Sequence, residues 1–244
     1  MRSEIEGPVV TIDGPAGSGK SSTAREVARR LTFRHLDSGA LYRGLTYALI
    51  EAGVLEAEWA NLAVKELHAL GLTLESTKTG FEVRLTGQLL VDELRSVEVT
   101  DRVSLLARVP AVRECLIGLQ REAGSGGGLI VDGRDMGTVV FPEAELKVYL
   151  VADLRERARR RLLESDREVF HDVDLAEEAL ALEERDDLDS RRAISPLKCP
   201  PGAVRIDTTH LSFEEQVSVI VELVNELTVR KRSSSFSGLD QGIT

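Results

Sequence analysis

A glycine-rich stretch near the start of the chain carries groups suited to phosphate chemistry. It reads GPAGSGKS and fits the pattern G-x-x-x-x-G-K-[ST] at every fixed position. Its backbone amides can wrap a phosphate, the Lys20 ammonium can reach the β- and γ-phosphates, and the Ser21 hydroxyl can bind Mg²⁺. The pattern does not tell where the phosphate goes. It predicts that a nucleoside triphosphate is held by Gly14, Pro15, Ala16, Gly17, Ser18, Gly19, Lys20, Ser21 and Ser22.

Arginine is the second residue type that could do chemistry here. Lysine occurs only six times among the 31 basic residues, which leaves 25 arginines. Genomic base composition explains this excess as well as a need for bidentate phosphate ligands does, so the position of each arginine must decide. Arg43 and Arg134 follow two expected strands and should flank one cleft. Further arginines expected to converge there are Arg113, Arg185, Arg191 and Arg192.

Several guanidinium groups around one cleft imply a second anion, and therefore transfer of the phosphate to a phosphorylated acceptor. An anionic phosphate oxygen is already a nucleophile at neutral pH, so positioning and charge neutralisation are needed rather than a general base. A mobile lid would also exclude water. Arg157, Arg160 and Arg161 share one helical face and could serve this lid, although a solvated face beside Glu156 and Glu164 explains them equally well.

The elements that must position these residues follow an α/β pattern. Short apolar runs at 8–12, 129–131, 146–151 and 203–206 alternate with helical patterns, which indicates a parallel sheet covered by helices on both faces. Ser212 and Glu215 predict a capping box at the start of the last helix. The apolar face of that helix comprises Val217, Ile220, Val221, Val224 and Leu227.

Two regions and the end of the chain depart from this pattern. Residues 72–91 alternate between apolar and polar, which predicts a small antiparallel hairpin inserted in the core. Residues 155–192 are dense in charge of both signs, and we expect helices that project from the core. The segment after Arg232 is polar and rich in serine and glycine, which predicts disorder.

Composition excludes several classes of protein. The formal net charge of −10 argues against a global grip on nucleic acid or on an anionic membrane. Aromatic residues make up only 4%, which argues against base-stacking platforms. Cys115 and Cys199 give no disulfide framework, and no apolar run approaches the ~18 residues of a membrane span. We therefore expect a cytoplasmic monomer without nucleic-acid or membrane partners.

Four segments, TIDGPAGSGKSS, LDSGALYR, VDGRDMGTVVFP and ERDDLDSRRAISPL, carry a family resemblance. In this order the chain resembles the bacterial cytidylate kinase family of P-loop nucleoside monophosphate kinases, over about Val9 to Leu227. The resemblance implies Mg²⁺-dependent transfer from ATP to CMP or dCMP, giving ADP and CDP or dCDP in pyrimidine nucleotide metabolism.

The fold implied by the resemblance is a P-loop NTPase-type parallel sheet with helices on both faces. Its core would comprise residues 8–40, 126–153 and 194–230. A monophosphate-binding insert containing the hairpin would span about 41–125, and a helical lid about 154–193. Residues 231–244 would form a disordered tail.

The resemblance also assigns roles to residues. Lys20 and Ser21 would serve ATP and Mg²⁺, Arg43 and Arg134 would bind the acceptor phosphate, and Ser38 would lie against the nucleotide. Arg192 would reach the phosphate, so the implied catalytic set is Lys20, Arg134 and Arg192.

The base and the ribose would be held by other segments. In VTDRVSLLARVPAVRE, Ser104 and Arg113 would lie on cytosine, and Asp135 of VDGRD would face the base. The ribose would be held by Arg185 and Asp189. The sequence departs from the family pattern at Leu188, where a basic residue is common, and at VTDRVS, which makes Ser104 a weaker assignment than Asp135.

Three other activities stay open. A P-loop kinase for another acceptor, such as UMP or a small metabolite, would lack the set Ser104, Arg113 and Asp135. A nucleotide-switched regulator would typically carry a guanine-reading N-K-x-D pattern, which the chain lacks, and would not need the arginine clusters. A nucleic-acid-binding ATPase is disfavoured by the net charge.

The remaining polar residues have structural explanations. Asp186 and Asp187 are interpreted as solvated charge, and Asp132 could either order water around Mg²⁺ or cap the end of a strand. Four histidines show no metal-ligand spacing and are expected at the surface or in packing: His35, His68, His171 and His210.

Overall fold

Five short segments pair as parallel strands in the computed structural model, which describes residues 7–164 and 170–237. Their order in the sheet is β2-β6-β1-β7-β8. The apolar runs in the sequence therefore form strands, and β7 has the predicted bounds. The strands are β1 (Val9–Asp13), β2 (Arg34–Asp37), β6 (Leu129–Gly133), β7 (Leu146–Val151) and β8 (Val204–Asp207).

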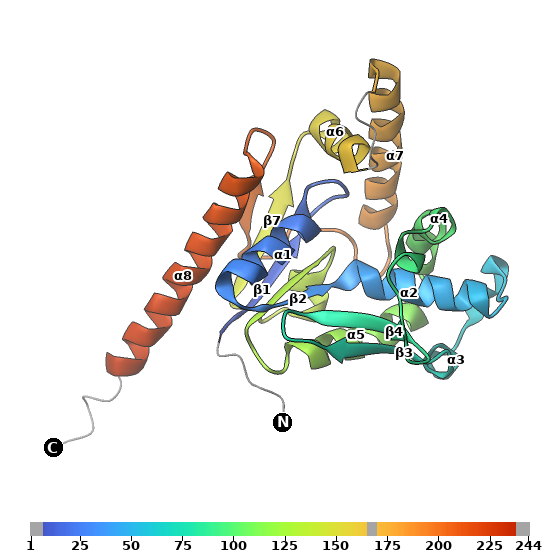
Figure 1. Ribbon diagram of the computed structural model, residues 1–244, viewed down its shortest axis with the longest axis horizontal. Helices are drawn as coiled ribbons and strands as arrows, with labels where there is room; N and C mark the ends of the chain where they lie inside the picture. Colours follow the sequence, from blue (N-terminus) through green and yellow to red (C-terminus); the bar gives the residue numbers. More distant parts are fainter. Residues whose placement is uncertain (1–6, 165–169, 238–244) are drawn as a thin grey trace.

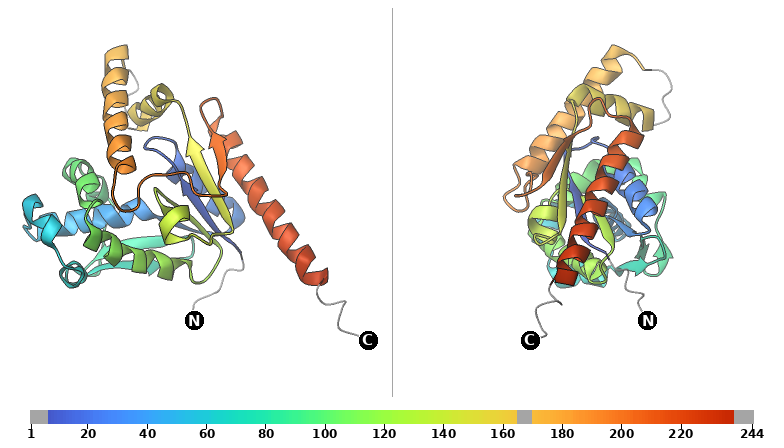
Figure 2. Two further views of the ribbon diagram at one scale, coloured as in Figure 1. Left: turned by 180° about the vertical axis from the view of Figure 1, so that it is seen from behind. Right: turned by 90° about the vertical axis from the view of Figure 1, so that its left-hand side faces the viewer.

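Alternate strand residues face opposite layers of helices. Val10 and Ile12 of β1 pack in a core with α1 (Lys20–Leu31) and α8 (Phe213–Ser237). Leu129 and Val131 of β6 pack in a second core with α2 (Ser38–Glu51) and α5 (Pro110–Gly124). Helices thus cover both faces of the sheet, as Figure 1 and Figure 2 show, and the predicted α/β fold class is confirmed.

A small antiparallel sheet lies within the segment between β2 and β6. It has three strands, β3 (Leu72–Ser76), β4 (Phe81–Leu85) and β5 (Gln88–Leu89), where the sequence predicts a single hairpin. The extra strand follows a tight turn in which Thr86 and Gly87 both have positive φ, a geometry typical of two-residue hairpin loops. The same segment also contains α3 (Val64–Ala69), α4 (Val97–Leu106) and two short 3₁₀ helices, Glu56–Asn61 and Glu93–Arg95.

Helices α6 (Leu154–Glu164) and α7 (Asp172–Ser190) project beyond the edge at which β7 ends, as predicted for the charged region (Figure 1). They meet the core at a small apolar cluster built on Ala16, Ala158 and Leu182. At the carboxyl end of β6, the chain continues into a single π-helical turn, η3 (Met136–Val140). The charged segment and the loop after β6 therefore lie at the same end of the sheet.

Helix α8 begins with the predicted capping box. The Ser212 amide donates to Glu215 at 2.8 Å, and the Glu215 amide donates to the Ser212 hydroxyl at 3.3 Å. The helix continues to Ser237, so the predicted disorder is wrong for residues 231–237. Adding a residue to an existing helix fixes few new torsions, which favours its continuation. Residues 238–244 lie outside the described residues. None of the described helices combines the length and apolar character needed to cross a membrane.

Candidate functional site

The carboxyl ends of β1, β6 and β2 meet because these strands are neighbours in the sheet. In the register, Asp13 pairs with Gly133 and Asp37 with Asp132, so the loops that follow begin at one level. These loops are the phosphate loop (residues 14–21), the start of α2, and the segment leading to η3. The sequence analysis expects Arg43 and Arg134 to flank one cleft because their segments follow strands, and this edge is where open parallel sheets bind ligands.

Glycines determine the path of the phosphate loop. Gly14, Gly17 and Gly19 have φ values of 151°, 71° and 83°, a region that favours glycine. A Cβ at Gly14 would also collide with the Leu150 carbonyl oxygen of β7. The loop ends at the first turn of α1, where free amides and the helix dipole favour an anion.

The Lys20 side chain is buried within this loop. Its Nζ donates to the Pro15 carbonyl at 2.6 Å and to the Ser18 hydroxyl at 3.4 Å. Burial, reinforced by the nearby Arg134 guanidinium, holds the pKa of Lys20 well below its ordinary value. A phosphate in the loop would favour the charged ammonium, because an opposite charge nearby offsets the cost of burial.

Ser21, Asp132 and His35 form a chain of polar contacts beside the loop. The Ser21 hydroxyl donates to Asp132 Oδ2 at 2.5 Å, and His35 Nε2 lies 2.8 Å from Asp132 Oδ1. Although burial opposes ionisation, these two neighbours hold the pKa of Asp132 below its ordinary value. A hydroxyl and an ionised carboxylate are hard oxygen ligands that fit Mg²⁺. Within residues 7–164 and 170–237 no three His, Cys, Asp or Glu gather as a metal cluster, and Mg²⁺ usually takes its other ligands from water and substrate phosphates.

Asp13, the last residue of β1, fixes the segment after β6. Its carboxylate accepts the amides of Met136 at 2.9 Å and Gly137 at 2.7 Å, in the first turn of η3. Burial outweighs these hydrogen bonds and raises the pKa of Asp13 to about 6. The phosphate loop and the segment carrying Arg134 and Asp135 are thereby held together.

Asp189 of α7 joins two of the predicted phosphate-binding arginines. Arg134 Nε donates to Asp189 Oδ2 at 2.9 Å, and Arg192 pairs with the other carboxylate oxygen. Although burial opposes ionisation, these arginines hold the pKa of Asp189 below its ordinary value. Burial, with Arg134 and Arg43 nearby, lowers the pKa of Arg185 to about 10. Positive charge is therefore concentrated where the sequence predicts a second anion.

A buried ion pair joins two residues predicted to contact the base. Arg113 of α5 donates to Asp135, and each side chain is only 3% exposed. Arg113 also donates to the Ala107 carbonyl at 3.3 Å, and its guanidinium lies 5.5 Å from the centre of the Tyr42 ring. Such a pair could present an acceptor and donors to a base edge, or it could simply brace α5 against the segment after β6.

The start of α2 places Ser38 and Arg43. Asp37 caps the helix by accepting the Ala40 amide at 3.0 Å, and its other oxygen accepts from Arg43 at 2.8 Å. Ser38 is buried, and a Cβ at Gly133 would lie 2.6 Å from its hydroxyl oxygen. The glycine of the VDGRD segment thus lets Ser38 approach the site closely.

Three other predicted residues are less closely tied to this edge. Ser104 is half-buried on α4. Ser22 is exposed, and its hydroxyl donates to the Gly19 carbonyl at 3.0 Å. Arg191 is 81% exposed and pairs with Asp187 at 2.7 Å, so its expected convergence with the other arginines is wrong. Both residues lie past Ser190, the last residue of α7, where the chain leaves the helix; Arg191 stays at the surface, whereas the Arg192 side chain is buried against Asp189.

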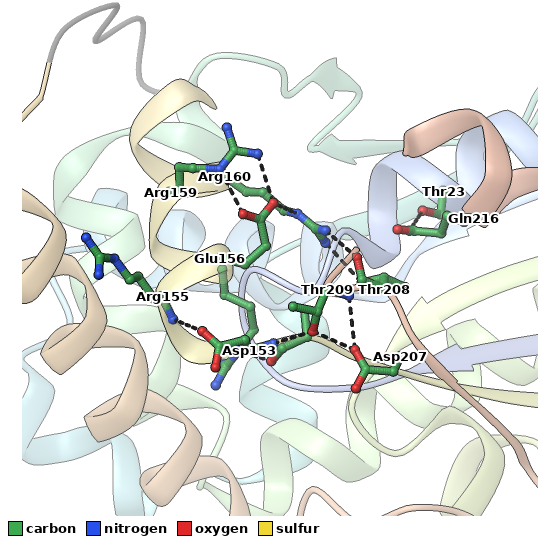
Figure 3. A network of polar contacts seen from close by, with 12 residues as sticks. Thr23, Asp153, Arg155, Glu156, Arg159, Arg160, Asp207, Thr208, Thr209 and Gln216 are labelled. Carbon is green, nitrogen blue, oxygen red and sulfur yellow. Dashed lines mark hydrogen bonds and ion pairs between the residues drawn. The ribbon is translucent and has the colours of Figure 1, made fainter. Parts of the chain in front are cut away.

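The three lid arginines attach to different partners. Arg157 is buried and donates to the Ala16 carbonyl at 3.0 Å. Arg160 donates to the Thr208 carbonyl at 2.6 Å and thereby ties α6 to the loop between β8 and α8 (Figure 3). Arg161 is 40% exposed and lies 3.7 Å from Glu178. They therefore do not form one free row of donors.

Two contacts come from residues that the sequence analysis assigned elsewhere. His35, expected at the surface or in packing, contacts Asp132, and Asp186, interpreted as solvated charge, accepts the Ala16 amide at 2.9 Å. The only signal for Asp186 was its position in the segment ERDDLDSRR beside Arg185. No spacing rule connects it to a residue 170 positions away.

Known proteins share these features of the sequence. Residues 10–226 match the family described as cytidylate kinase. A cytidylate kinase of Geobacillus sp. (strain WCH70) is 42% identical over 228 residues, which cover 93% of this chain and 99% of the relative. That of Geobacillus kaustophilus (strain HTA426) is 44% identical, covering 89% and 96%, and that of Acholeplasma laidlawii (strain PG-8A) is 40% identical, covering 88% and 94%. On this evidence the chain belongs to the cytidylate kinase family.

Proposed function

We propose that this chain transfers the γ-phosphoryl group of ATP to CMP or dCMP, giving ADP and CDP or dCDP. The observation that carries the proposal is the placement of a complete phosphate loop beside the cluster of Arg134, Arg185 and Arg192. A loop alone would indicate nucleotide binding. The adjoining arginines indicate that a second anion is held next to it.

On the donor side, the amides of the phosphate loop hold the phosphates of ATP, and Lys20 follows the migrating group. The Ser21 hydroxyl and the Asp132 carboxylate hold Mg²⁺ together with the nucleotide. When bound, Mg²⁺ neutralises charge that accumulates on the phosphates. His35 keeps the Asp132 carboxylate oriented through its 2.8 Å contact.

On the acceptor side, some of the proposed binding residues already contact one another: Asp189 pairs with Arg134 and Arg192, and Arg113 pairs with Asp135. Arg43, Arg134 and Arg192 bind the phosphate of CMP, with Ser38 beside the nucleotide. The ribose is held by Asp189 and Arg185. The cytosine base contacts Asp135, Arg113 and Ser104.

The reaction needs no general base. An anionic oxygen of the CMP phosphate attacks the γ-phosphorus, a new P–O bond forms, and the bond to the β–γ bridging oxygen breaks. ADP leaves with that electron pair. Phosphoryl transfer is accelerated by positioning the two substrates and by neutralising the transition-state charge, and fixed cationic side chains can do both.

A coupled ADP-release assay tests the proposal. The full chain is incubated with Mg²⁺ and ATP and with CMP, dCMP, UMP, AMP or GMP in turn. We expect CMP and dCMP to accelerate ADP release strongly and UMP to do so far less. The Lys20→Ala variant, purified identically, controls for contaminating kinases. Equal acceleration by UMP, or by none of the nucleotides, would contradict the proposal.

A further inference from the structure

Two side chains from α6 and α7 close around one residue of the phosphate loop. Asp186 Oδ1 accepts the Ala16 amide at 2.9 Å, and Arg157 Nη1 donates to the Ala16 carbonyl at 3.0 Å. Asp186 and Arg157 also pair with each other, and their side chains are only 18% and 10% exposed. Both backbone groups of Ala16 are therefore held by one largely desolvated ion pair, an arrangement in which hydrogen bonds are strong.

Packing reinforces this clamp. The Ala16 methyl group is buried with Ala158 and Leu182 in the apolar cluster between the two helices. Gly17, the next residue, has a φ of 71°, and a Cβ there would lie 3.1 Å from the Arg157 carbonyl oxygen. The loop cannot shift at this point without moving α6 or breaking the contact to α7.

We propose that Asp186 is a positioning residue for the phosphate loop, acting through Ala16 and Arg157. It follows Arg185 and precedes Asp189 by three positions, so one turn of α7 holds the donor loop and carries two acceptor-side groups. This inference rests on the proposed function. Phosphoryl transfer depends on alignment, and a displacement of about 1 Å caused by a remote change can cost about 10²-fold in rate.

The contact between Asp186 and the Ala16 amide could instead inhibit ATP binding. The carboxylate occupies an amide of the loop, and a donor phosphate could compete for that amide. Removal of Asp186 would then tighten ATP binding. A positioning role predicts instead that removal slows transfer while the CMP side is little changed, because Asp186 is bonded to the donor loop.

The experiment compares the full chain with five variants in steady-state kinetics and calorimetric ATP titration. These are Asp186→Ala, Asp186→Asn, Arg157→Met, the double variant Asp186→Ala/Arg157→Met, and the control Asp187→Ala. Asp187 lies on the same helix, but it pairs at the surface with Arg191. Thermal unfolding shows whether each variant is folded at the assay temperature, and Asp186→Asn and Arg157→Met carry the test if Asp186→Ala does not fold.

We expect Asp186→Ala to lower kcat at least tenfold, whereas its KM for CMP should stay within about twofold of the wild-type value. Asp186→Asn, which keeps an acceptor oxygen for the Ala16 amide, should recover part of the loss. The double variant should be no worse than the more impaired single variant, and Asp187→Ala should stay within twofold. An unchanged kcat, equal loss in Asp187→Ala, additive losses, or tighter ATP binding would each overturn the inference. A wild-type chain that does not phosphorylate CMP would instead refute the proposed function itself.

Discussion

Among single residues, Lys20 has the most constrained surroundings of the donor side. Its ammonium is buried, donates to the Pro15 carbonyl, and lies near Arg134. We propose that this charge follows the transferred group, so its contribution should be larger in the transition state than in the ATP complex. We expect Lys20→Ala to lower kcat by about 10²–10³-fold, the range found when one transition-state donor is removed. Calorimetry should show a much smaller loss of ATP affinity, and near-normal turnover in a folded variant would refute this role.

The Arg113–Asp135 pair allows a test of base discrimination. Cytosine offers an N4 donor and an N3 acceptor, whereas uracil offers the reverse. A carboxylate only accepts and a guanidinium only donates, so the pair complements cytosine and opposes uracil. Unpaired buried groups cost ~1–3 kcal/mol each, which separates CMP from UMP by roughly two orders of magnitude in kcat/KM. Asp135→Ala and Arg113→Met should narrow that ratio, chiefly by harming CMP.

The control for this prediction removes both charges. Asp135→Ala alone leaves a buried arginine without its partner, which is costly to stability, whereas Arg113→Met/Asp135→Ala leaves no unpaired charge. If the pair only braces α5 against the segment after β6, CMP and UMP will weaken equally in both single variants. An unchanged CMP/UMP ratio would therefore defeat the base-contact assignment.

At the scale of residues, the conformation of a segment could be predicted where its pattern is local and continuous. The phosphate loop is a continuous segment, and its glycines show the positive φ values that the pattern requires. The contact of Asp186 with Ala16 depends on how α7 docks, and that of His35 with Asp132 depends on the register of β2 against β6. Neither is encoded in local spacing. Arg191 shows the converse, since its neighbour Arg192 faces the site and Arg191 does not.

At the scale of elements, the junction of β1 with η3 makes stability depend on pH through Asp13. Burial raises the pKa of Asp13 to about 6 in the folded protein, against an ordinary value of about 3.9 in the unfolded chain. The folded state therefore binds this proton more tightly, and the resulting stabilisation is present at low pH and lost as pH rises through 6. At about 1.4 kcal/mol per pKa unit, the loss is on the order of 3 kcal/mol.

Urea unfolding of the wild type and Asp13→Asn between pH 4 and pH 7.5 measures this effect. The stability of the wild type minus that of the variant should fall as pH rises, because the amide does not titrate. The comparison cancels contributions from Asp189 and Asp132, whose lowered pKa values change stability in the opposite sense. A flat difference would show that folding does not shift the pKa of Asp13, and a rising difference would show that folding lowers it; either would contradict the prediction.

Strands and helices were easier to predict from the sequence when a longer run of side chains marked them. The longest strand, β7, has its predicted bounds, although Lys147 interrupts its apolar run and only Val148 and Leu150 are buried. Strand β5 has two exposed residues and depends on the turn at Thr86 and Gly87, so no run of side chains marks it. The prediction of disorder after Arg232 rested on the serine-rich composition of that segment. Composition alone does not show that the segment continues an existing helix, α8.

At the scale of the whole molecule, charge is segregated. The chain carries a net charge of −10, yet the cations of the site lie close enough to depress one another's pKa, as Arg134 does for Lys20 and Arg185. Net charge therefore argues only against broad binding of nucleic acid and says nothing about a local anion site. The site gathers side chains from the core, from the segment between β2 and β6, and from α7.

This assembly from separate parts predicts that ATP alone is hydrolysed slowly. The cationic side chains come from several elements and repel one another, and the phosphates of ATP and CMP offset this repulsion. We therefore expect the reactive arrangement to be complete only when ATP and CMP are both bound. Without CMP, the phosphate loop and Lys20 hold ATP, but the groups around Asp189 hold no acceptor phosphate. We expect CMP to raise the rate of ADP release by at least about 10²-fold over the rate with ATP and Mg²⁺ alone. Inorganic phosphate and AMP at equal concentration serve as controls for a non-specific anion effect. A high basal rate that CMP does not change would mean that water reaches the γ-phosphate freely, which would favour a nucleotide-hydrolysing switch or motor over a kinase.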